Sequence, residues 1–370
     1  MTETSPPPEP PSPPESLLKR IFSLPFLAAG WLLCLFLLWV LSPLVGERNP
    51  AVATTLFVWP LFWLGPVLVL LPLRSIRKRK WLWGMLAGSI VYHTVFFMKL
   101  RFHPGSSRPE GEQALCIVTY NRGEEGKTSP AGFISGVNAG IVVIQDAKGR
   151  AARYQRDTAY AAFTHAKDIG EFTILSKYPV LNAELVGQSK APPAGDAPLA
   201  ARFEVDFLGT KIAIYSVHFM TPRRELVSYR RGAPLYGILG LIPGTPWQAK
   251  SAKLQAFWDA RIADVETVLT AIRNDPLPAV MAGDMNMIDR GWNYRQVAKD
   301  LTDCHAALGN GYGFSMPGTT MNPVALFRPW MRLDYIWAGK TWQVLHSETE
   351  TDRDSQHMAV AAWLTLSRTP

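Results

Sequence analysis

The sequence predicts a large α/β domain preceded by three transmembrane helices. Three stretches without a charged residue lie within the first hundred of the 370 positions, and each approaches the length of about 20 apolar residues that a helix needs to cross a bilayer. From about residue 113 the chain instead alternates short β-branched runs with helical stretches, which is the pattern of an α/β domain. The remaining length, about 260 residues, is enough for one domain with a substantial core.

The composition of the N-terminus sets the first boundary. Residues 1–14 are dominated by Pro, Glu, Ser and Thr, and such a stretch lacks the apolar side chains that offset the entropy cost of ordering. We therefore predict a disordered tail over residues 1–18 and a membrane anchor over residues 19–100. A single α/β domain is expected over residues 101–370.

The predicted anchor consists of three uncharged runs, at 21–46, 49–73 and 81–98. The first could also be a secretory signal, but no small-residue cleavage pattern closes it and two further apolar runs follow. Pro60, Pro66 and Pro72 in the second run would kink that helix. The third run is the shortest, and a buried helix of a soluble domain is its alternative.

Basic residues set the predicted orientation of the anchor. Lys19 and Arg20 precede the first run, and five of the seven residues 74–80 are Lys or Arg. Positively charged loops stay in the cytoplasm, so three spans would place the chain after Arg101 on the extracytoplasmic side of a bacterial-type inner membrane. Much of the net charge of +8 lies near this loop. The charge therefore favours the lipid bilayer, and not nucleic acid, as a partner.

Within the α/β domain, the sequence predicts one long helix and seven strands. The helix spans 252–272, because apolar residues recur there at intervals of three and four. Residues 223–245 form a long connection with an apolar centre, which would be a lid, a bilayer-touching loop or a satellite of the core. The strands are expected at 115–120, 141–144, 172–175, 201–207, 211–217, 279–282 and 333–337.

The string Gly283-Asp284-Met285-Asn286 follows one of these predicted strands. Side chains two residues apart at the exit of a strand point the same way, so Asp284 and Asn286 are expected to face one cleft. A carboxylate beside an amide suits a site that orients water and holds a phosphate oxygen. Gly, Asp and Asn are also the residues of an ordinary turn, so a plain turn is the alternative interpretation of this string alone.

Similar polar strings mark the ends of other predicted strands. They are Thr119-Tyr120-Asn121, Gln145-Asp146, Ser216-Val217-His218, Arg332-Leu333-Asp334-Tyr335 and the following Ser355-Gln356-His357. In order, spacing and strand context, the strings resemble the endonuclease/exonuclease/phosphatase superfamily, the deoxyribonuclease-like phosphoesterases, over about 250 residues. Leu175-Ser176-Lys177-Tyr178-Pro179-Val180 resembles that family's serine-arginine-tyrosine-proline segment. The layout of the anchor is similar to the branch that includes vancomycin-resistance-type membrane proteins.

The resemblance implies a four-layer sandwich, in which two mixed β-sheets pack face to face between helices and the active site lies where strand ends meet. Phosphoester hydrolysis needs a base for the attacking water, donors for the non-bridging oxygens and a divalent cation. Oxygen-rich ligands imply magnesium or manganese. The implied roles are water activation by Asp284, phosphate binding by Asn286 and His218, phosphoryl stabilisation or acid/base catalysis by His357 with Asp334 orienting it, metal binding by Asp146 and Gln356, and metal or substrate binding by Asn121.

Two positions depart from the family's pattern. Asp146 stands where the family usually has Glu, and Gln356 stands where it usually has Asp. The second change removes a negative charge and so weakens the expected affinity for a divalent cation. A catalytically weakened binding module of the same fold is therefore an alternative to an active enzyme.

The predicted function is a membrane-anchored, metal-dependent phosphoesterase. An anchored enzyme has a high effective concentration towards substrates in its own membrane, so a lipid-linked phosphate or a phospholipid headgroup is favoured over DNA. A non-specific nuclease is the alternative enzyme. The sequence does not predict an oligomeric state.

Overall fold

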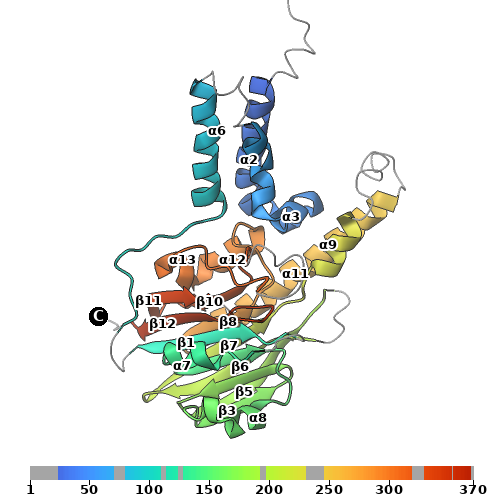
Figure 1. The fold of residues 1–370 in the computed structure, drawn as a ribbon. Coiled ribbons are helices and arrows are strands. Elements are labelled where there is room, and N and C mark those ends of the chain that lie inside the picture. Colours follow the sequence, from blue (N-terminus) through green and yellow to red (C-terminus); the bar gives the residue numbers. More distant parts are fainter. Residues whose placement is uncertain are drawn as a thin grey trace, which may run out of the picture.

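The computed structural model describes residues 24–70, 80–109, 114–123, 128–191, 197–230, 246–318, 329–351 and 353–367. An N-terminal helical region is followed by a sandwich of two β-sheets, with helices on its outer faces (Figure 1). The tail predicted over 1–18 and most of the connection at 223–245 lie outside the described residues.

Each sheet contains six strands. The first has the order β11-β12-β1-β2-β4-β3, and the second has the order β5-β6-β7-β8-β10-β9. The pairs β1/β2 and β7/β8 are parallel and the others are antiparallel, so the two mixed sheets that the resemblance implied are confirmed. The strands of the first sheet are β1 (Leu115–Asn121), β2 (Ile141–Gln145), β3 (His165–Ile169), β4 (Phe172–Ser176), β11 (Trp342–Thr349) and β12 (Val360–Leu366). Those of the second are β5 (Val180–Gln188), β6 (Pro198–Phe207), β7 (Thr210–His218), β8 (Ala279–Asp284), β9 (Thr302–Asp303) and β10 (Asp334–Ala338).

The two sheets pack face to face through an apolar core. Ile117 and Val143 of the first sheet share one cluster with Phe203, Ile214 and Val280 of the second, and all five are fully buried. Apolar side chains of the outer faces contact helices, which complete the predicted layers. These helices are α11 (Pro246–Asn274) and α12 (Trp292–Asp300) on the second sheet, and α7 (Ala131–Gly136) and α8 (Ala151–Arg156) on the first. The predicted helix at 252–272 is the central part of α11.

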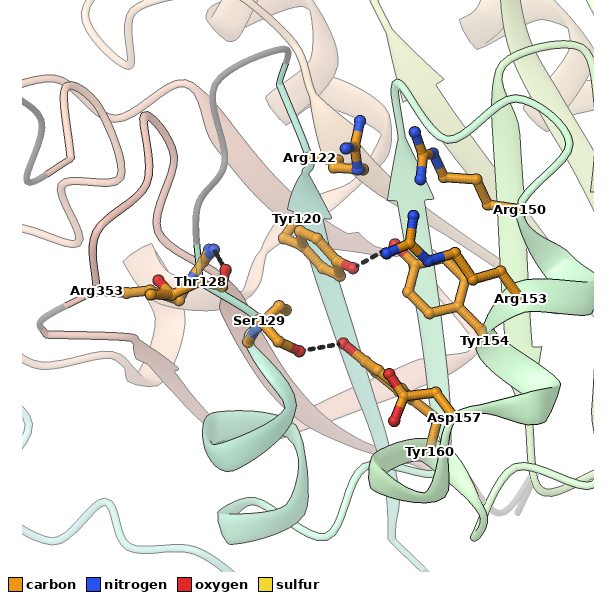
Figure 2. A pocket seen from close by; sticks show the side chains of 11 residues that line it. Tyr120, Arg122, Thr128, Ser129, Arg150, Arg153, Tyr154, Asp157, Tyr160 and Arg353 are labelled. Atoms are coloured by element: carbon orange, nitrogen blue, oxygen red, sulfur yellow. Dashed lines mark hydrogen bonds between the residues drawn. The ribbon is translucent and has the colours of Figure 1, made fainter.

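A pocket of about 190 Å³ opens on the outer side of the first sheet, near the end of β1 (Figure 2). Tyr120 and Tyr160 are buried in its wall. Its lining combines tyrosines with arginines that follow β1, begin or belong to α8, and precede β12. The sequence strings did not predict this pocket.

The N-terminal helical region, residues 24–97, begins with α2 (Leu24–Leu44). Within the described residues, Phe26–Leu44 is the one helix that is long and apolar enough by itself to cross a membrane, and a signal sequence would have the same properties. It confirms the length and composition predicted for the first span.

The second and third runs are less regular than predicted. The second contains α3 (Pro50–Leu56), the short 3₁₀ helix Pro60–Leu64 and α4 (Gly65–Leu70), with a bend of 97° after α3. Together they could form one broken span. The third contains α6 (Lys80–Tyr92), which a π-helical turn follows. The second and third spans therefore stay predictions.

The bent segment after α2 packs against the α/β domain. Ala53, Leu56 and Phe57 share an apolar cluster with Leu254 and Trp258 of α11. The rings of Phe57 and Trp258 stack with their centroids 5.8 Å apart. Part of the predicted second span thus belongs to the core of the domain.

The 285–291 loop, which joins β8 to α12, receives polar contacts from the same region. Glu47 is fully buried, and its Oε2 accepts a hydrogen bond from the amide nitrogen of Trp292 at 2.7 Å. Arg290 of the loop donates to the carbonyl oxygen of Leu56 at 2.9 Å. Since the loop begins directly after β8, these contacts connect the N-terminal region to the strand that carries Asp284.

A buried ion pair joins β9 to the segment before β10. The guanidinium group of Arg332 donates two hydrogen bonds to the carboxylate of Asp303, and both side chains are almost completely buried. Burial alone would raise the pKa of Asp303, but the charge and hydrogen bonds of Arg332 outweigh it and lower this pKa to about 2. The carboxylate is thus stabilised in its charged form.

We expect the protein to lose stability in acid, because protonation of Asp303 removes this ion pair. The folded protein binds fewer protons at Asp303 than the unfolded chain, so the contribution is complete above about pH 4 and is lost as the pH falls towards 2. It amounts to about 2 kcal/mol. Urea unfolding between pH 5 and pH 3 should show a steeper loss for the wild type than for Asp303→Asn, and equal slopes would contradict the prediction.

Candidate active site

Neighbouring strand ends bring four of the predicted residues to one edge of the sandwich. Asp284, the last residue of β8, is in register with His218 at the end of β7 and with Asp334 at the start of β10. Asn121 is the last residue of β1 in the facing sheet. The hydrogen-bonding pattern of the strands therefore sets the positions of these side chains.

The backbone around Asp284 adopts an unusual conformation on both sides. Gly283 has a φ of 150°, and a Cβ there would overlap the carbonyl oxygen of Val217 on the neighbouring strand. Asn286 has a φ of 44°, in the left-handed region that Asn tolerates better than most residues. Its Nδ2 donates to the carbonyl oxygen of Phe219 at 2.9 Å. The phosphate contact expected of Asn286 stays a prediction.

Asp284 lies at the centre of the first group of side chains. Its Oδ2 accepts a hydrogen bond from Nδ2 of Asn121 at 2.9 Å and lies 3.7 Å from Nε2 of His218 and 3.8 Å from Nε2 of His357. Its Oδ1 accepts one from the amide nitrogen of Asn286 at 3.0 Å. Burial raises the pKa of Asp284, although the nearby His357 opposes this effect. A carboxylate in this environment is suited to accept a proton.

Asp334 and His357 form a hydrogen-bonded pair beside Asp284. Oδ2 of Asp334 lies 2.9 Å from Nδ1 of His357, and Asp334 has no exposed surface. Arg353 donates to the carbonyl oxygen of His357 at 2.8 Å and so fixes its main chain. Burial disfavours the charged imidazole, but the carboxylates of Asp334 and Asp284 outweigh it and raise the pKa of His357 to about 9. His357 is therefore a proton donor near neutral pH.

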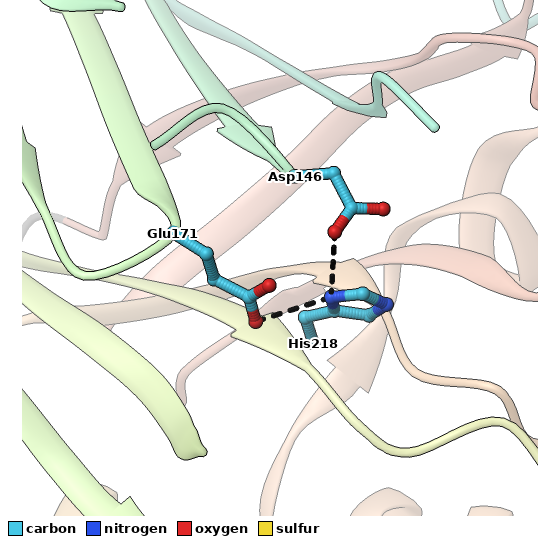
Figure 3. A group of neighbouring side chains, drawn as sticks. All are labelled: Asp146, Glu171 and His218. Atoms are coloured by element: carbon cyan, nitrogen blue, oxygen red, sulfur yellow. Dashed lines mark hydrogen bonds and ion pairs between the residues drawn. The ribbon is translucent and has the colours of Figure 1, made fainter. Parts of the chain in front are cut away.

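A second group consists of Asp146, Glu171 and His218, whose potential ligand atoms all lie within 4.8 Å of one another. Nδ1 of His218 is 3.2 Å from Oε1 of Glu171 and 3.8 Å from Oδ1 of Asp146 (Figure 3). Asp146 has a left-handed backbone, with a φ of 54°. Burial raises the pKa of Asp146, and the adjacent Glu171 adds to the effect while His218 opposes it.

His218 connects the two groups, because its two ring nitrogens face different carboxylates. Nδ1 faces the second group, whereas Nε2 faces Asp284 and lies 3.4 Å from Nδ2 of Asn121. Burial lowers the pKa of His218, but the hydrogen bond to Glu171 and the surrounding carboxylates raise it to about 9. Protonation of one imidazole thus compensates several buried negative charges.

The second group has a donor set that fits a divalent cation. Two carboxylates and one imidazole are ligands for manganese as well as magnesium. Asp146 was predicted as a metal ligand, and the structure places it in this group. Asn121 lies elsewhere, since its Oδ1 accepts from the amide of Gly123 at 2.8 Å. Gln356 lies beside Gly123, since a Cβ added at Gly123 would be 3.4 Å from Oε1 of Gln356.

The sequence interpretation did not include two residues of the site. Glu171 lies in the turn between β3 and β4, and β3 was not among the predicted strands. Arg261 of α11 is fully buried and donates to the carbonyl oxygen of Met285 at 2.9 Å, within the Asp284 string. Its position on the apolar face of a predicted helix was the available signal, because a charge there needs a partner.

Comparisons with known proteins agree with this architecture. The sequence model of the Endonuclease/Exonuclease/phosphatase family matches residues 129–357. No curated protein matches the chain significantly in sequence.

Three solved structures are similar to part of this chain at low sequence identity. A humanized form of Danio rerio TDP2 is 17% identical, with a TM-score of 0.46, and the match covers 69% of this chain and 100% of that one. An endonuclease/exonuclease/phosphatase from Beutenbergia cavernae is 18% identical, with a TM-score of 0.45, and the match covers 70% of this chain and 73% of that one. Sphingomyelinase C from Streptomyces griseocarneus is 16% identical, with a TM-score of 0.44, and the match covers 68% of this chain and 99% of that one.

The assignment to a family rests on the sequence model and not on these distant structures. The matched segment, 129–357, covers more than half of the 370 residues. It includes both groups of side chains except Asn121. The chain belongs to the endonuclease/exonuclease/phosphatase family.

Proposed function

We propose that the chain is a membrane-anchored, divalent-metal-dependent phosphoesterase that hydrolyses a phosphodiester or phosphomonoester at the membrane surface. The arrangement around Asp284 carries this proposal, because a buried carboxylate lies between two imidazoles and an amide. Asp284 accepts the proton of the attacking water, whose oxygen forms a bond to phosphorus. The ester bond then breaks, and His357 donates its proton to the leaving oxygen.

The remaining side chains position these groups. Asp334 accepts a hydrogen bond from Nδ1 of His357, which leaves Nε2 to face Asp284 and the reacting phosphate. Nδ2 of Asn121 and the main-chain nitrogen of Asn286 donate to the carboxylate of Asp284, and the second N–H of each side-chain amide can donate to a phosphate oxygen. Nε2 of His218, which lies 3.7 Å from the same carboxylate, donates to a phosphate oxygen while Nδ1 faces Asp146 and Glu171.

Asp146, Glu171 and His218 would hold the divalent cation. When bound, magnesium or manganese neutralises the charge that develops on the phosphoryl oxygens. Gln356 stands where the family usually has Asp, so the site has one carboxylate fewer than the family's pattern. Glu171 supplies a carboxylate in its place. This donor set supports an active enzyme over a weakened binding module.

Metal removal and neutral variants test this function. The full chain in detergent should hydrolyse bis-p-nitrophenyl phosphate with magnesium or manganese and lose this activity in EDTA. Glu171→Gln should raise the metal concentration for half-maximal rate by about 10-fold or more, since ligand charge sets affinity. Glu266→Gln, on the exposed face of α11, is the matched control. Full activity in EDTA would overturn the proposal, and metal binding without turnover would favour the binding module.

The proposed location is the extracytoplasmic side of the membrane. The first residues of α2 and α6 both lie at the end of the helical region that points away from the sandwich (Figure 1). Basic residues precede both helices in the sequence, at 19–20 and 74–80. This arrangement supports an orientation in which basic segments lie in the cytoplasm and the α/β domain lies outside. A substrate in the same membrane, such as a lipid-linked phosphate, fits this location.

The location is testable, because an odd and an even number of membrane spans place the C-terminus on different sides of the membrane. One or three spans with a cytoplasmic N-terminus place the C-terminus outside, whereas two spans place it inside. A C-terminal alkaline phosphatase fusion in bacteria should therefore be active, and a C-terminal green fluorescent protein fusion should be dark. The opposite pair of signals would contradict the proposed orientation.

A further inference from the structure

The arginine-lined pocket on the outer side of the first sheet adjoins the catalytic centre. Tyr120 and Arg122 line it, and they flank Asn121, which contacts Asp284. Arg353 also lines the pocket and donates to the carbonyl oxygen of His357 at 2.8 Å. The pocket and the catalytic centre therefore share the end of β1 and the segment before β12 as a common wall.

The pocket has a strong excess of positive charge. Arg122, Arg150 and Arg153 line one part of it (Figure 2), and no ion pair joins them to a carboxylate among the residues that the structure describes. Arg353 is different, because Glu350 holds it in an ion pair of 2.8 Å. Three cations that have no ion-pair partner in the described part of the chain repel one another, so this arrangement favours a negatively charged occupant.

Among the described residues that line the pocket, the acidic side chain does not form an ion pair with these arginines. Of the described residues that line it, Asp157 is the one acid. Its Oδ1 accepts from the amide of Ala159 at 3.0 Å, at the start of a 3₁₀ helix. The role of Asp157 is therefore to cap that helix.

Tyrosine hydroxyl groups add hydrogen-bonding capacity to the pocket. The hydroxyl of Tyr120 lies 2.9 Å from that of Tyr154, and the hydroxyl of Tyr160 lies 2.7 Å from Oγ of Ser129 (Figure 2). Burial raises the pKa of Tyr120 and of Tyr160, so both phenols remain neutral. Neutral hydroxyl groups beside guanidinium groups are donors that suit phosphate oxygens.

We propose that this pocket binds a second, non-reacting phosphate group of the substrate, while the phosphate that reacts lies at Asp284. The proposal rests on the phosphoesterase function proposed above and narrows its substrate to molecules with at least two phosphate groups, such as a diphosphate headgroup. Arginine recognises phosphate through two parallel hydrogen bonds. A volume of about 190 Å³ suits one compact phosphate group better than an extended nucleic acid strand.

Two chromogenic substrates that differ in one phosphate test the proposal. The first is the p-nitrophenyl ester of thymidine 5′-phosphate, and the second carries an additional 3′-phosphate. The full chain in detergent should prefer the second substrate in kcat/KM. In Arg150→Gln/Arg153→Gln this preference should fall by about 10- to 100-fold, the range expected for lost hydrogen bonds to a charged group.

A matched variant controls for the loss of charge. Arg156→Gln/Lys167→Gln also removes two positive charges, but neither residue lines the pocket, and the preference should stay as in the wild type. An unchanged preference in Arg150→Gln/Arg153→Gln would overturn the proposal. An equal fall in both double variants would also overturn it, because net charge alone would then explain the effect.

A binding measurement separates this proposal from the proposed function. Calorimetry without metal should show that inorganic pyrophosphate binds the wild type at least about 10-fold more tightly than it binds Arg150→Gln/Arg153→Gln. If neither substrate is hydrolysed but this difference is found, the phosphoesterase function fails and the anion site stands. Equal affinities would exclude the anion site whether or not hydrolysis occurs. Much tighter, steeply salt-dependent binding of oligothymidylate would assign the pocket to nucleic acid instead.

Discussion

Replacement of Asp284 by Asn is expected to lower kcat by about 1000-fold, because a positioned general base contributes about 10²- to 10⁴-fold to the rate. The amide keeps the shape of the side chain and can still accept from the amide nitrogen of Asn286. It cannot take a proton from water. Hydrolysis of bis-p-nitrophenyl phosphate at saturating magnesium or manganese measures the effect.

The same variant, Asp284→Asn, should not lower the stability of the folded protein. Burial raises the pKa of Asp284 and thus penalises its charge in the folded protein, so a neutral Asn at this position should leave the melting temperature equal or higher. Asp289→Asn, in the 285–291 loop, is the matched control, since the contact of Asp289 with Lys99 uses its main-chain oxygen. A fall in kcat of less than about 10-fold would remove Asp284 from the role of base.

Replacement of Arg332 by Met is expected to lower the free energy of unfolding by about 3–5 kcal/mol. Removal of one partner leaves an uncompensated charge, here the carboxylate of Asp303, in the interior. Asp303 also accepts a hydrogen bond of 2.6 Å from the hydroxyl of Tyr294, which does not replace the lost cation. Urea unfolding of the full chain in detergent at pH 7 measures the loss.

The double variant Arg332→Met/Asp303→Asn identifies the cause of this loss. It removes both charges, and Asn can still accept at the start of the short helix Cys304–Leu308, where Asp303 bonds the amide nitrogen of His305 at 3.0 Å. The double variant should recover a large part of the stability. If it is less stable than Arg332→Met, the buried charge is not the reason for the loss.

The sequence predicted the strands at the centre of each sheet better than those at the edges. All seven predicted strands correspond to interior strands of the two sheets, and most of them are buried along nearly their whole length. The interior strand β12 was not predicted, although it is mostly buried. β5, at the edge of the second sheet, alternates between half-buried and exposed positions, and its mixed composition did not distinguish it from a loop. Edge strands bury less apolar surface, so their sequences carry a weaker signal.

The residues of the candidate site show the same difference between central strands, where they were predicted, and an edge, where one was missed. Asp284, Asp334 and His218 follow or begin central strands, so strand register alone places them together. Glu171 enters the site from a hairpin that includes the edge strand β3, and no string in the sequence marks it. Pairing between strands that are distant in sequence determines such a contact, and local patterns contain no record of it.

The contacts of the N-terminal helical region with the α/β domain limit how the chain can be truncated and whether this region can be replaced. Glu47 binds the start of α12, and Leu56 packs in one cluster with Ile288 and Leu333. A fragment that began after residue 100 would expose this apolar surface and leave α12 without its carboxylate. We therefore expect the helical region to be an integral part of the folded protein, and its replacement by an unrelated tether should remove the contacts that hold the 285–291 loop and the start of α12.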